Sequence, residues 1–377
     1  MRILIAPDSY KESLSATNVS YAMRDGILSV YPKADIDICP MSDGGEGTIE
    51  AIIRAVGGHI LSCKTTGPLN QKIKAKWATL PDKKTAIIEM AQTAGLNLVP
   101  PDRRDPTRTT TFGVGELIER AIDSGAENII IGIGGSATND GGTGMAQALG
   151  IRFYDKRGMI NKPMNGGMLN GLKKIDCSFL NPHISQIKIL AACDVTNPLT
   201  GANGAAAVYG PQKGATCRQI KELDSGLRHL VSLLPGSKPK HPGAGAAGGL
   251  GFGLTTFLGA EIVSGIRLML KIAKFGERVK RADLVLTGEG SLDGQTLKGK
   301  VCYGVAQAAL KYNVPTIAVA GSIGFRAKKL LSGGILANFS ICDRPMTQEE
   351  AFKDAYRLIK AQTASIIKCF MYSKIKA

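Results

Sequence analysis

The chain has 377 residues, 44% of them hydrophobic, and its 47 Lys and Arg against 31 Asp and Glu give a formal net charge of +16. This length favours two α/β domains over a single core. Only 5% of the residues are aromatic, so few side chains could stack on bases. The charge therefore favours a lysine-rich solvated surface and a small anionic ligand over nucleic acid.

The sequence gives no sign of membrane insertion or secretion. No apolar run approaches the ~18–20 residues of a membrane helix, and MRILIAP lacks a charged-then-apolar leader. The eight cysteines include no Cys-x-x-Cys pair, and the four histidines lack metal-ligand spacing. We therefore expect a cytoplasmic protein with reduced thiols, without a membrane partner and without a zinc site.

Strand–loop–helix units are predicted at the start of the chain. The apolar stretch Ile3–Ile5 leads through a polar loop into a helix over Ala16–Val30. A second short strand, Ile36–Ile38, leads through SDGGEGT into a helix over Ile49–Val56. Short apolar strands that alternate with helices favour parallel βαβ units, whose functional loops follow the carboxyl ends of the strands.

The next segment has a different period. QKIKAKWATL, Gln71–Leu80, places Ile73, Ala75 and Trp77 on one face and its lysines on the other. A period of two predicts a half-exposed antiparallel strand. HILSCKT before it and KTAIIEM after it would complete a three-stranded meander.

A glycine-rich loop, GIGGSATNDGGTG (residues 132–144), follows another apolar strand. Gly132–Ala137 fits the dinucleotide pattern G-x-G-x-x-A, and Asp155 lies about where a ribose-binding acid would fall. One such match among 46 glycines is weak evidence. An NAD-dependent hydroxy-acid dehydrogenase is therefore an alternative rather than the main interpretation.

The C-terminal part returns to the parallel pattern. Strands are predicted within Asp283–Gly290, Val314–Ser322 and Ile335–Asp343, with a closing helix around Glu350–Lys368. The run GQTLKGKV between the first two strands ends in Val301, where a phosphate loop needs Ser or Thr. The standard P-loop is therefore excluded, and no G-x-S-x-G hydrolase elbow occurs.

These patterns predict a fold of the α/β class with two domains. Residues 1–60 and 260–377 would form a discontinuous domain with a parallel sheet. Residues 61–259 would form an inserted, mixed α/β domain. Ligand sites often form where domains meet, so we expect the active site in a cleft between them.

Six polar loops combine glycine with carboxylate, lysine or hydroxyl groups. For any one loop, turn formation and helix capping are the simpler explanation. Six such loops after strands are expected to converge on one crevice. Their groups suit phosphoryl transfer, which needs charge neutralisation, positioning and Mg²⁺ held by one or two carboxylates. The residues thus predict an ATP- and Mg²⁺-dependent kinase of a small anionic substrate. The loops are Ala6–Ala16, Pro40–Thr48, residues 132–144, Ala192–Leu199, Tyr209–Ala215 and Thr287–Lys300.

The sequence closely resembles the bacterial (type 1) glycerate kinase family from Met1 to the C-terminal helix. The motifs that carry the resemblance, in chain order, are APDSYKESLSA, DGGEGT, GIGGSATNDGGTGMAQALG, ACDVTNPL, GPQKGA, GAGAAGGLG and TGEGSLDGQTLKGK. The resemblance implies ATP-dependent phosphorylation of D-glycerate, usually to 2-phosphoglycerate, in glyoxylate or sugar-acid catabolism. It also implies two α/β domains, one flavodoxin- or Rossmann-like, with the site between them. Ser42 and Cys302 depart from the family's usual Ala and Pro, without loss of a charged or hydroxyl group.

Roles within this site are hypotheses. Asp194 is the first candidate, and Asp293 the second, for the base that accepts the glycerate hydroxyl proton. Lys11 is the third predicted catalytic residue, as a partner for phosphate or carboxylate. Glu289 and Asp293 are the candidate Mg²⁺ ligands, although they could instead cap the following helix. The residues predicted to bind nucleotide or substrate are Ser9, Asp43, Gly134, Gly135, Ser136, Thr138, Asn139, Asn197, Lys213, Gln295 and Lys300.

A non-catalytic sugar-acid-binding protein is the other alternative. Such a protein is expected to have lost carboxylates such as Asp194, Glu289 or Asp293, and all three are present. The sequence leaves open whether the chain forms a homo-oligomer.

Overall fold

The structure, a computed structural model, describes residues 1–293, 300–324 and 331–375. It divides into two compact units. The first unit comprises Met1–Asp43, Glu50–Gly57 and Ile266–Ala377, and the second comprises Gly44–Ile49 and Gly58–Gly265. The sequence assigned all of residues 1–60 to the first domain. Gly44–Ile49 instead belongs to the second unit, because Gly44 packs against the backbone of Gly132 and Ala192.

The first unit contains a five-stranded parallel sheet of order β14-β13-β12-β1-β2. In chain order within this unit, that arrangement is 2-1-3-4-5, the flavodoxin-like doubly wound order. The expected parallel sheet from both ends of the chain is confirmed. The strands are β1 (Arg2–Ile5), β2 (Asp35–Ile38), β12 (Leu284–Leu292), β13 (Thr316–Ile323) and β14 (Ile335–Ser340).

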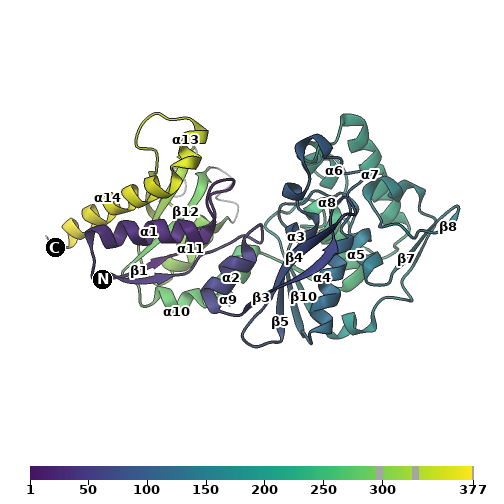
Figure 1. The fold of residues 1–377 in the computed structure, drawn as a ribbon, viewed down its shortest axis with the longest axis horizontal. Helices are drawn as coiled ribbons and strands as arrows, with labels where there is room; N and C mark the ends of the chain where they lie inside the picture. The colour runs from purple at the N-terminus through teal and green to yellow at the C-terminus, as the bar shows by residue number, and fades with distance from the viewer. Residues whose placement is uncertain (294–299, 325–330, 376–377) are drawn as a thin grey trace. The chain divides into compact units, whose positions relative to one another are not determined.

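Helices cover both faces of this sheet. On one face α1 and α14 lie side by side (Figure 1), and apolar residues of both, such as Val19 and Ile359, join the same buried cluster. On the other face, Cys302 and Ala306 of α11 pack against β12 and β13. The helices are α1 (Ala16–Val30), α2 (Thr48–Val56), α9 (Gly265–Ile272), α10 (Phe275–Val279), α11 (Val301–Leu310), α13 (Gln348–Lys353) and α14 (Ala355–Ile375).

The predicted closing helix is present as α14, but a break that was not predicted separates its first turn as α13. The chain forms α13 and then α14, and Asp354 between them has non-helical backbone angles (φ −92°, ψ 2°). Thr347 and Glu350 form a capping box that starts α13.

The second unit contains a six-stranded mixed sheet of order β11-β10-β6-β5-β4-β3. Its first four strands are parallel, and β4 runs antiparallel to both β5 and β3, which confirms the predicted meander. Ala75 and Trp77 of β4 are buried while the alternating lysines are exposed. The strands are β3 (His59–Thr66), β4 (Lys72–Thr79), β5 (Thr85–Glu89), β6 (Asn128–Gly132), β10 (Lys188–Ala192) and β11 (Glu261–Val263).

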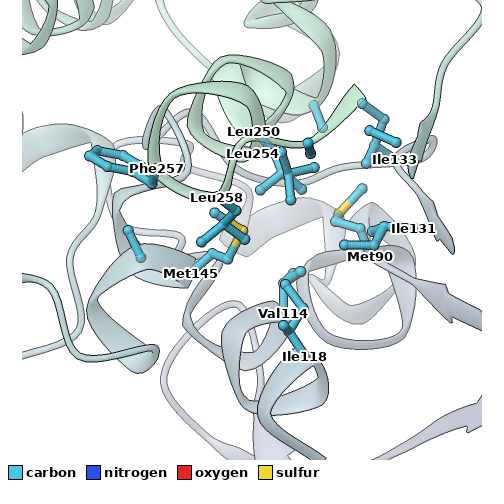
Figure 2. Close-up of a cluster of buried hydrophobic side chains, with 14 of the residues drawn as sticks. Met90, Val114, Ile118, Ile131, Ile133, Met145, Leu250, Leu254, Phe257 and Leu258 are labelled. Atoms are coloured by element: carbon cyan, nitrogen blue, oxygen red, sulfur yellow. The ribbon is translucent and has the colours of Figure 1, made fainter. Parts of the chain in front are cut away.

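The core of this unit lies between the sheet and helices α4, α5 and α8. Figure 2 shows Ile131 and Met90 from the sheet side facing Val114, Met145 and Leu254 from these helices. A small antiparallel sheet, β8-β7-β9, was not predicted. Within the described chain, no helix is long and apolar enough to span a membrane. The remaining elements are α3 (Ala91–Ala94), α4 (Phe112–Asp123), α5 (Thr143–Ala148), β7 (Arg152–Asp155), β8 (Gly158–Met159), β9 (Lys174–Asp176), α6 (Ala205–Tyr209), α7 (Cys217–Ser232) and α8 (Ala246–Leu258).

Candidate active site

A cavity of about 660 Å³ opens in the first unit at the carboxyl ends of β1, β12 and β13. The strand order of the sheet reverses between β1 and β12, which are neighbours in Figure 1. Doubly wound sheets bind their ligands at such a switch point. Five predicted site residues from three of the predicted loops line this cavity: Ser9, Lys11, Asp43, Glu289 and Lys300. Their individual roles stay predictions.

Asp8 lies in the loop after β1, lines the cavity and is only 6% exposed. The pKa of this carboxyl is raised from 3.8 to about 8, chiefly by burial and then by the charges of Asp43 and Glu289, while the Ser9 N–H and the charge of Lys11 act in the opposite direction. The Ser9 backbone N–H donates to Asp8 Oδ1 at 2.7 Å. A carboxyl whose pKa lies near neutrality is suited to take up or release a proton during turnover.

Asp8 is not among the site residues predicted from the sequence. Its one signal was its place in the polar loop after the first strand, which it shares with Ser9 and Lys11. What distinguishes it is desolvation beside two other carboxylates, and those carboxylates come from distant parts of the chain.

Glu289 lies on β12 and is 5% exposed. Its charge adds to the effect of burial in raising the pKa of both Tyr10 and Cys302 well above their usual values. The Tyr10 hydroxyl donates to the Val319 carbonyl at 2.7 Å. Tyr10 and Cys302 are therefore neutral at physiological pH, and Cys302 acts as an apolar core residue of α11.

Two lysines bring positive charge to the cavity. Lys11 comes from the loop after β1, and Lys300 occupies the N-cap position of α11. Lys300 Nζ lies 3.8 Å from Asp293 Oδ1. Asp293 thus pairs with a residue of the cavity lining without forming part of that lining. Gln295, the remaining predicted residue of this loop, lies outside the described residues.

The carboxylates do not form a closed metal cage. In the described ranges, no group of three or more His, Cys, Asp or Glu side chains is arranged to hold a metal ion. Mg²⁺ usually keeps several waters and binds through one or two carboxylates together with substrate phosphates. The carboxylate oxygens of Glu289 and of the acids close to it in the cavity fit this way of binding Mg²⁺.

The predicted residues of the glycine-rich loop lie in the second unit, after β6. A Cβ atom at Gly134 would lie 2.7 Å from the Gly45 Cα, and Gly135 has a φ of +74°. These glycines therefore allow two stretches of the protein's own backbone to approach closely. Close approach of a ligand is not needed to explain them.

The side chains of the same loop are largely enclosed. Ser136 is 7% exposed, and Thr138 and Asn139 are fully buried. Neither Thr138 Oγ1 nor the Asn139 side-chain amide has a hydrogen-bond partner within the part of the chain that the structure describes. These buried polar groups call for an explanation such as an internal water or a ligand. Their predicted contact with nucleotide or substrate stays a prediction.

Lys213 forms a hydrogen bond with the backbone of this loop. Its Nζ donates to the Thr138 carbonyl at 2.5 Å, and the side chain is almost completely buried. Burial lowers its pKa from 10.5 to about 7, partly offset by the charge of Asp140. Burial raises the pKa of Asp140, which accepts hydrogen bonds from the backbone and hydroxyl of Thr111 and from two glycine N–H groups.

Asp194 and Asn197 follow β10. Asp194 Oδ1 accepts hydrogen bonds from Ser264 Oγ at 2.7 Å and from the Gly265 N–H at 3.1 Å, where α9 begins. Asn197 accepts from the Tyr209 hydroxyl and donates to the Asn203 carbonyl. These contacts are those of residues that order a loop and a helix start, so the catalytic role of Asp194 stays a prediction.

The topology argues against a dinucleotide-binding unit at Gly132–Ala137. Such a unit needs a crossover helix and a second parallel strand that carries the ribose-binding acid. The strand after α5 is β7, which pairs antiparallel with β8 and β9 in a separate sheet. Asp155 ends β7 and is therefore not placed like that acid.

Comparison with known proteins identifies relatives over the full chain. The Glycerate kinase family model matches residues 3–371. A glycerate kinase of Halalkalibacterium halodurans is 47% identical over 99% of both chains, and a glycerate 2-kinase of Escherichia coli is 49% identical over 94% of both. A crystal structure of a "putative glycerate kinase 2" from Salmonella typhimurium matches with a TM-score of 0.86 and 44% identity over 99% of both chains.

Proposed function

The chain belongs to the glycerate kinase family and is a kinase that uses an alcohol group as acceptor; we propose that it transfers the γ-phosphoryl group of ATP to D-glycerate. In this reaction the glycerate hydroxyl loses its proton, its oxygen bonds to the γ-phosphorus, and the bond from that phosphorus to the bridging oxygen breaks to release ADP. Because the Escherichia coli relative is named a glycerate 2-kinase, we propose 2-phosphoglycerate as the product. The place in glyoxylate or sugar-acid catabolism that the family resemblance implies stays part of this proposal.

The observation that carries this proposal is the buried Asp8 carboxyl in the cavity at the switch point of the parallel sheet. A kinase must remove a proton from an alcohol and neutralise phosphate charge. Asp8, with its pKa raised to about 8, is suited to accept that proton. Lys11 and Lys300 in the same lining are suited to bind phosphate oxygens.

The lining also contains apolar groups suited to a nucleotide. Ile341, Met346 and Phe352 line the cavity together with the polar groups. An apolar wall that carries a few well-placed polar groups is typical of small-molecule sites. We therefore assign ATP to the first unit.

Glu289, with Asp43 or Asp293, would hold Mg²⁺. When bound there with the nucleotide, the ion would neutralise charge on the phosphate oxygens. The buried loop of Ser136, Thr138 and Asn139 in the second unit, ordered by Lys213, is proposed to bind substrate. Asp194 is the competing candidate for the base.

Substitution of both candidate bases tests the assignment. Asp8→Asn keeps the shape of the side chain and removes its basicity, so we expect kcat to fall about 10²–10⁴-fold, as the loss of a general base commonly does. Asp194→Asn keeps an oxygen that can accept the hydrogen bonds at the start of α9. We therefore expect its kcat to fall by less than about tenfold. The measurement is coupled ADP release with D-glycerate, ATP and Mg²⁺, followed by identification of the phosphorylated position.

Other outcomes would change the proposal in distinct ways. A large loss in Asp194→Asn alone would move the base to Asp194. Absence of ADP release by the unmodified chain across a panel of hydroxy acids would contradict the kinase reaction itself.

A further inference from the structure

A second cavity, of about 360 Å³, lies in the second unit and has no part in the proposed reaction. Three stretches far apart in the sequence form its walls, namely residues 69–70, 102–108 and 162–168. They contribute Asn70 from the β3–β4 turn, Asp102 and Arg103 from a 3-10 turn, Arg108 from the loop before α4, and Lys162 and Asn165 from the stretch after β8.

The charged groups in this lining are mainly cationic and lack carboxylate partners. Arg103, Arg108 and Lys162 face one acid, Asp102. Among the described residues, none of these three cations forms an ion pair, whereas Arg218, Arg228 and Arg278 each bind a carboxylate. Three unpaired cations that share one hollow repel each other and favour an anion between them.

The backbone that carries these side chains is held by hydrogen bonds between the walls. The Thr110 N–H donates to the Pro68 carbonyl, which joins the segment of Arg108 to the β3–β4 turn. The Gly167 N–H donates to the Thr107 carbonyl, which joins the same segment to the stretch of Asn165. Gln147 binds the Lys162 carbonyl and the Met164 N–H. The cations are therefore brought together by a fixed frame.

We propose that this cavity is a binding site for a small phosphate-bearing acid. Two guanidinium groups can bind phosphate or carboxylate oxygens bidentately, and Lys162 adds a third positive charge. The Asn70 and Asn165 amides can donate to the remaining oxygens. The volume lies within the range of small-molecule sites. This site is separate in sequence from the Asp8 cavity and does not depend on the proposed kinase reaction.

Titration calorimetry on the full chain tests this site. The probes are inorganic phosphate, 3-phosphoglycerate and, as a carboxylate without phosphate, D-glycerate. We expect 3-phosphoglycerate to bind most tightly, because it offers two anionic groups to three cations. Arg103→Ala and Arg108→Ala should each weaken its binding about tenfold or more, the usual effect of losing a charge-assisted hydrogen bond. Both variants should retain the unmodified kcat when the assay contains no added inorganic phosphate or 3-phosphoglycerate.

Arg157→Ala is the matched control, since it removes the same charge from the exposed β7–β8 turn outside this cavity. It should change the affinity less than twofold. Equal weakening by Arg157→Ala would show a general charge effect and overturn the site. Binding unaffected by Arg103→Ala and Arg108→Ala, or no binding of 3-phosphoglycerate up to about 10 mM, would also overturn it.

Discussion

Lys213 is a charged residue that the second unit encloses almost completely, and its environment makes stability depend on pH. Its pKa falls from 10.5 in the unfolded chain to about 7 in the folded one, because burial disfavours the ammonium form. Between these values the unfolded chain binds a proton that the folded chain has released. The free energy of unfolding must therefore rise with pH between about pH 7 and pH 10.5. Below about pH 7 the folded chain carries the full free-energy cost of the buried ammonium charge.

Lys213→Met removes this contribution and keeps the length of the side chain. We expect the unmodified chain to gain up to about 1.4 kcal/mol of unfolding free energy per pH unit between pH 7 and 9, relative to the variant. Denaturant unfolding at both pH values measures the difference. Lys156→Met, at an exposed position, is the control and should behave like the unmodified chain. The same pH dependence in Lys213→Met and the unmodified chain would contradict a depressed pKa at Lys213.

Single residues also show where the sequence stops being informative. Lys11, Asp43 and Glu289 could be selected because each lies in a polar loop at the end of a strand, and topology then brings such loops together. Asp8 has the same local signature, and only three-dimensional burial beside Asp43 and Glu289 sets it apart. The predicted contact of Lys213 with nucleotide or substrate stays a prediction, and its hydrogen bond to the Thr138 carbonyl could not be indicated by any local pattern.

Among the elements, the start of α8 has an unusual backbone that supports the buried loop before α5. Ala247, Gly248 and Gly249 all have left-handed angles, with φ between 53° and 90°. A Cβ atom at Gly248 would collide with the Thr138 carbonyl and lie 2.6 Å from the Asn139 Cα. Glycine is therefore required there for both its conformation and its size.

Gly248→Ala and Gly259→Ala separate these two requirements. Both positions have a φ of +67°, but a Cβ at Gly259 meets no atom within 4 Å. Gly259→Ala should cost about 1–2 kcal/mol from backbone strain alone. Gly248→Ala should cost about 1–3 kcal/mol more through overlap, and should raise the KM of the enzyme because the Thr138–Asn139 loop shifts. Chemical unfolding and steady-state kinetics measure both, and equal losses of stability would show that the overlap is relieved without cost.

The predictability of the elements follows their periodicity. The parallel strands of the first unit and the meander of the second have clear apolar patterns, and both were predicted correctly. The α13–α14 break was missed because the apolar pattern continues past Asp354. The small sheet of β7, β8 and β9 was missed because its short strands RFYD, GM and KID have no clear apolar pattern. From the sequence, the left-handed turn of α8 is recognisable only as a Gly/Ala-rich segment. Its geometry depends on packing against the Thr138–Asn139 loop, about 110 residues earlier in the chain.

At the scale of the whole molecule, the two units have separate hydrophobic cores. The cluster around α1 and α14 shares no residue with the cluster around α4, α5 and α8. The first unit is built from both ends of the chain, so its sheet forms only when segments more than 200 residues apart pair through β1 and β12. Units with their own cores are expected to open separately.

Paired core truncations test this independence. Ile359→Ala in α14 and Ile118→Ala in α4 each remove a fully buried side chain, at a cost of about 2–5 kcal/mol. We expect Ile359→Ala to speed amide hydrogen exchange in β1 and β12 while β6 stays protected, and Ile118→Ala to have the reverse effect. Each variant is the control for the other, because the residue type and the burial are the same. If either variant accelerates exchange equally in β12 and β6, the two cores unfold as one cooperative block, and stability in one unit is then set by packing in the other.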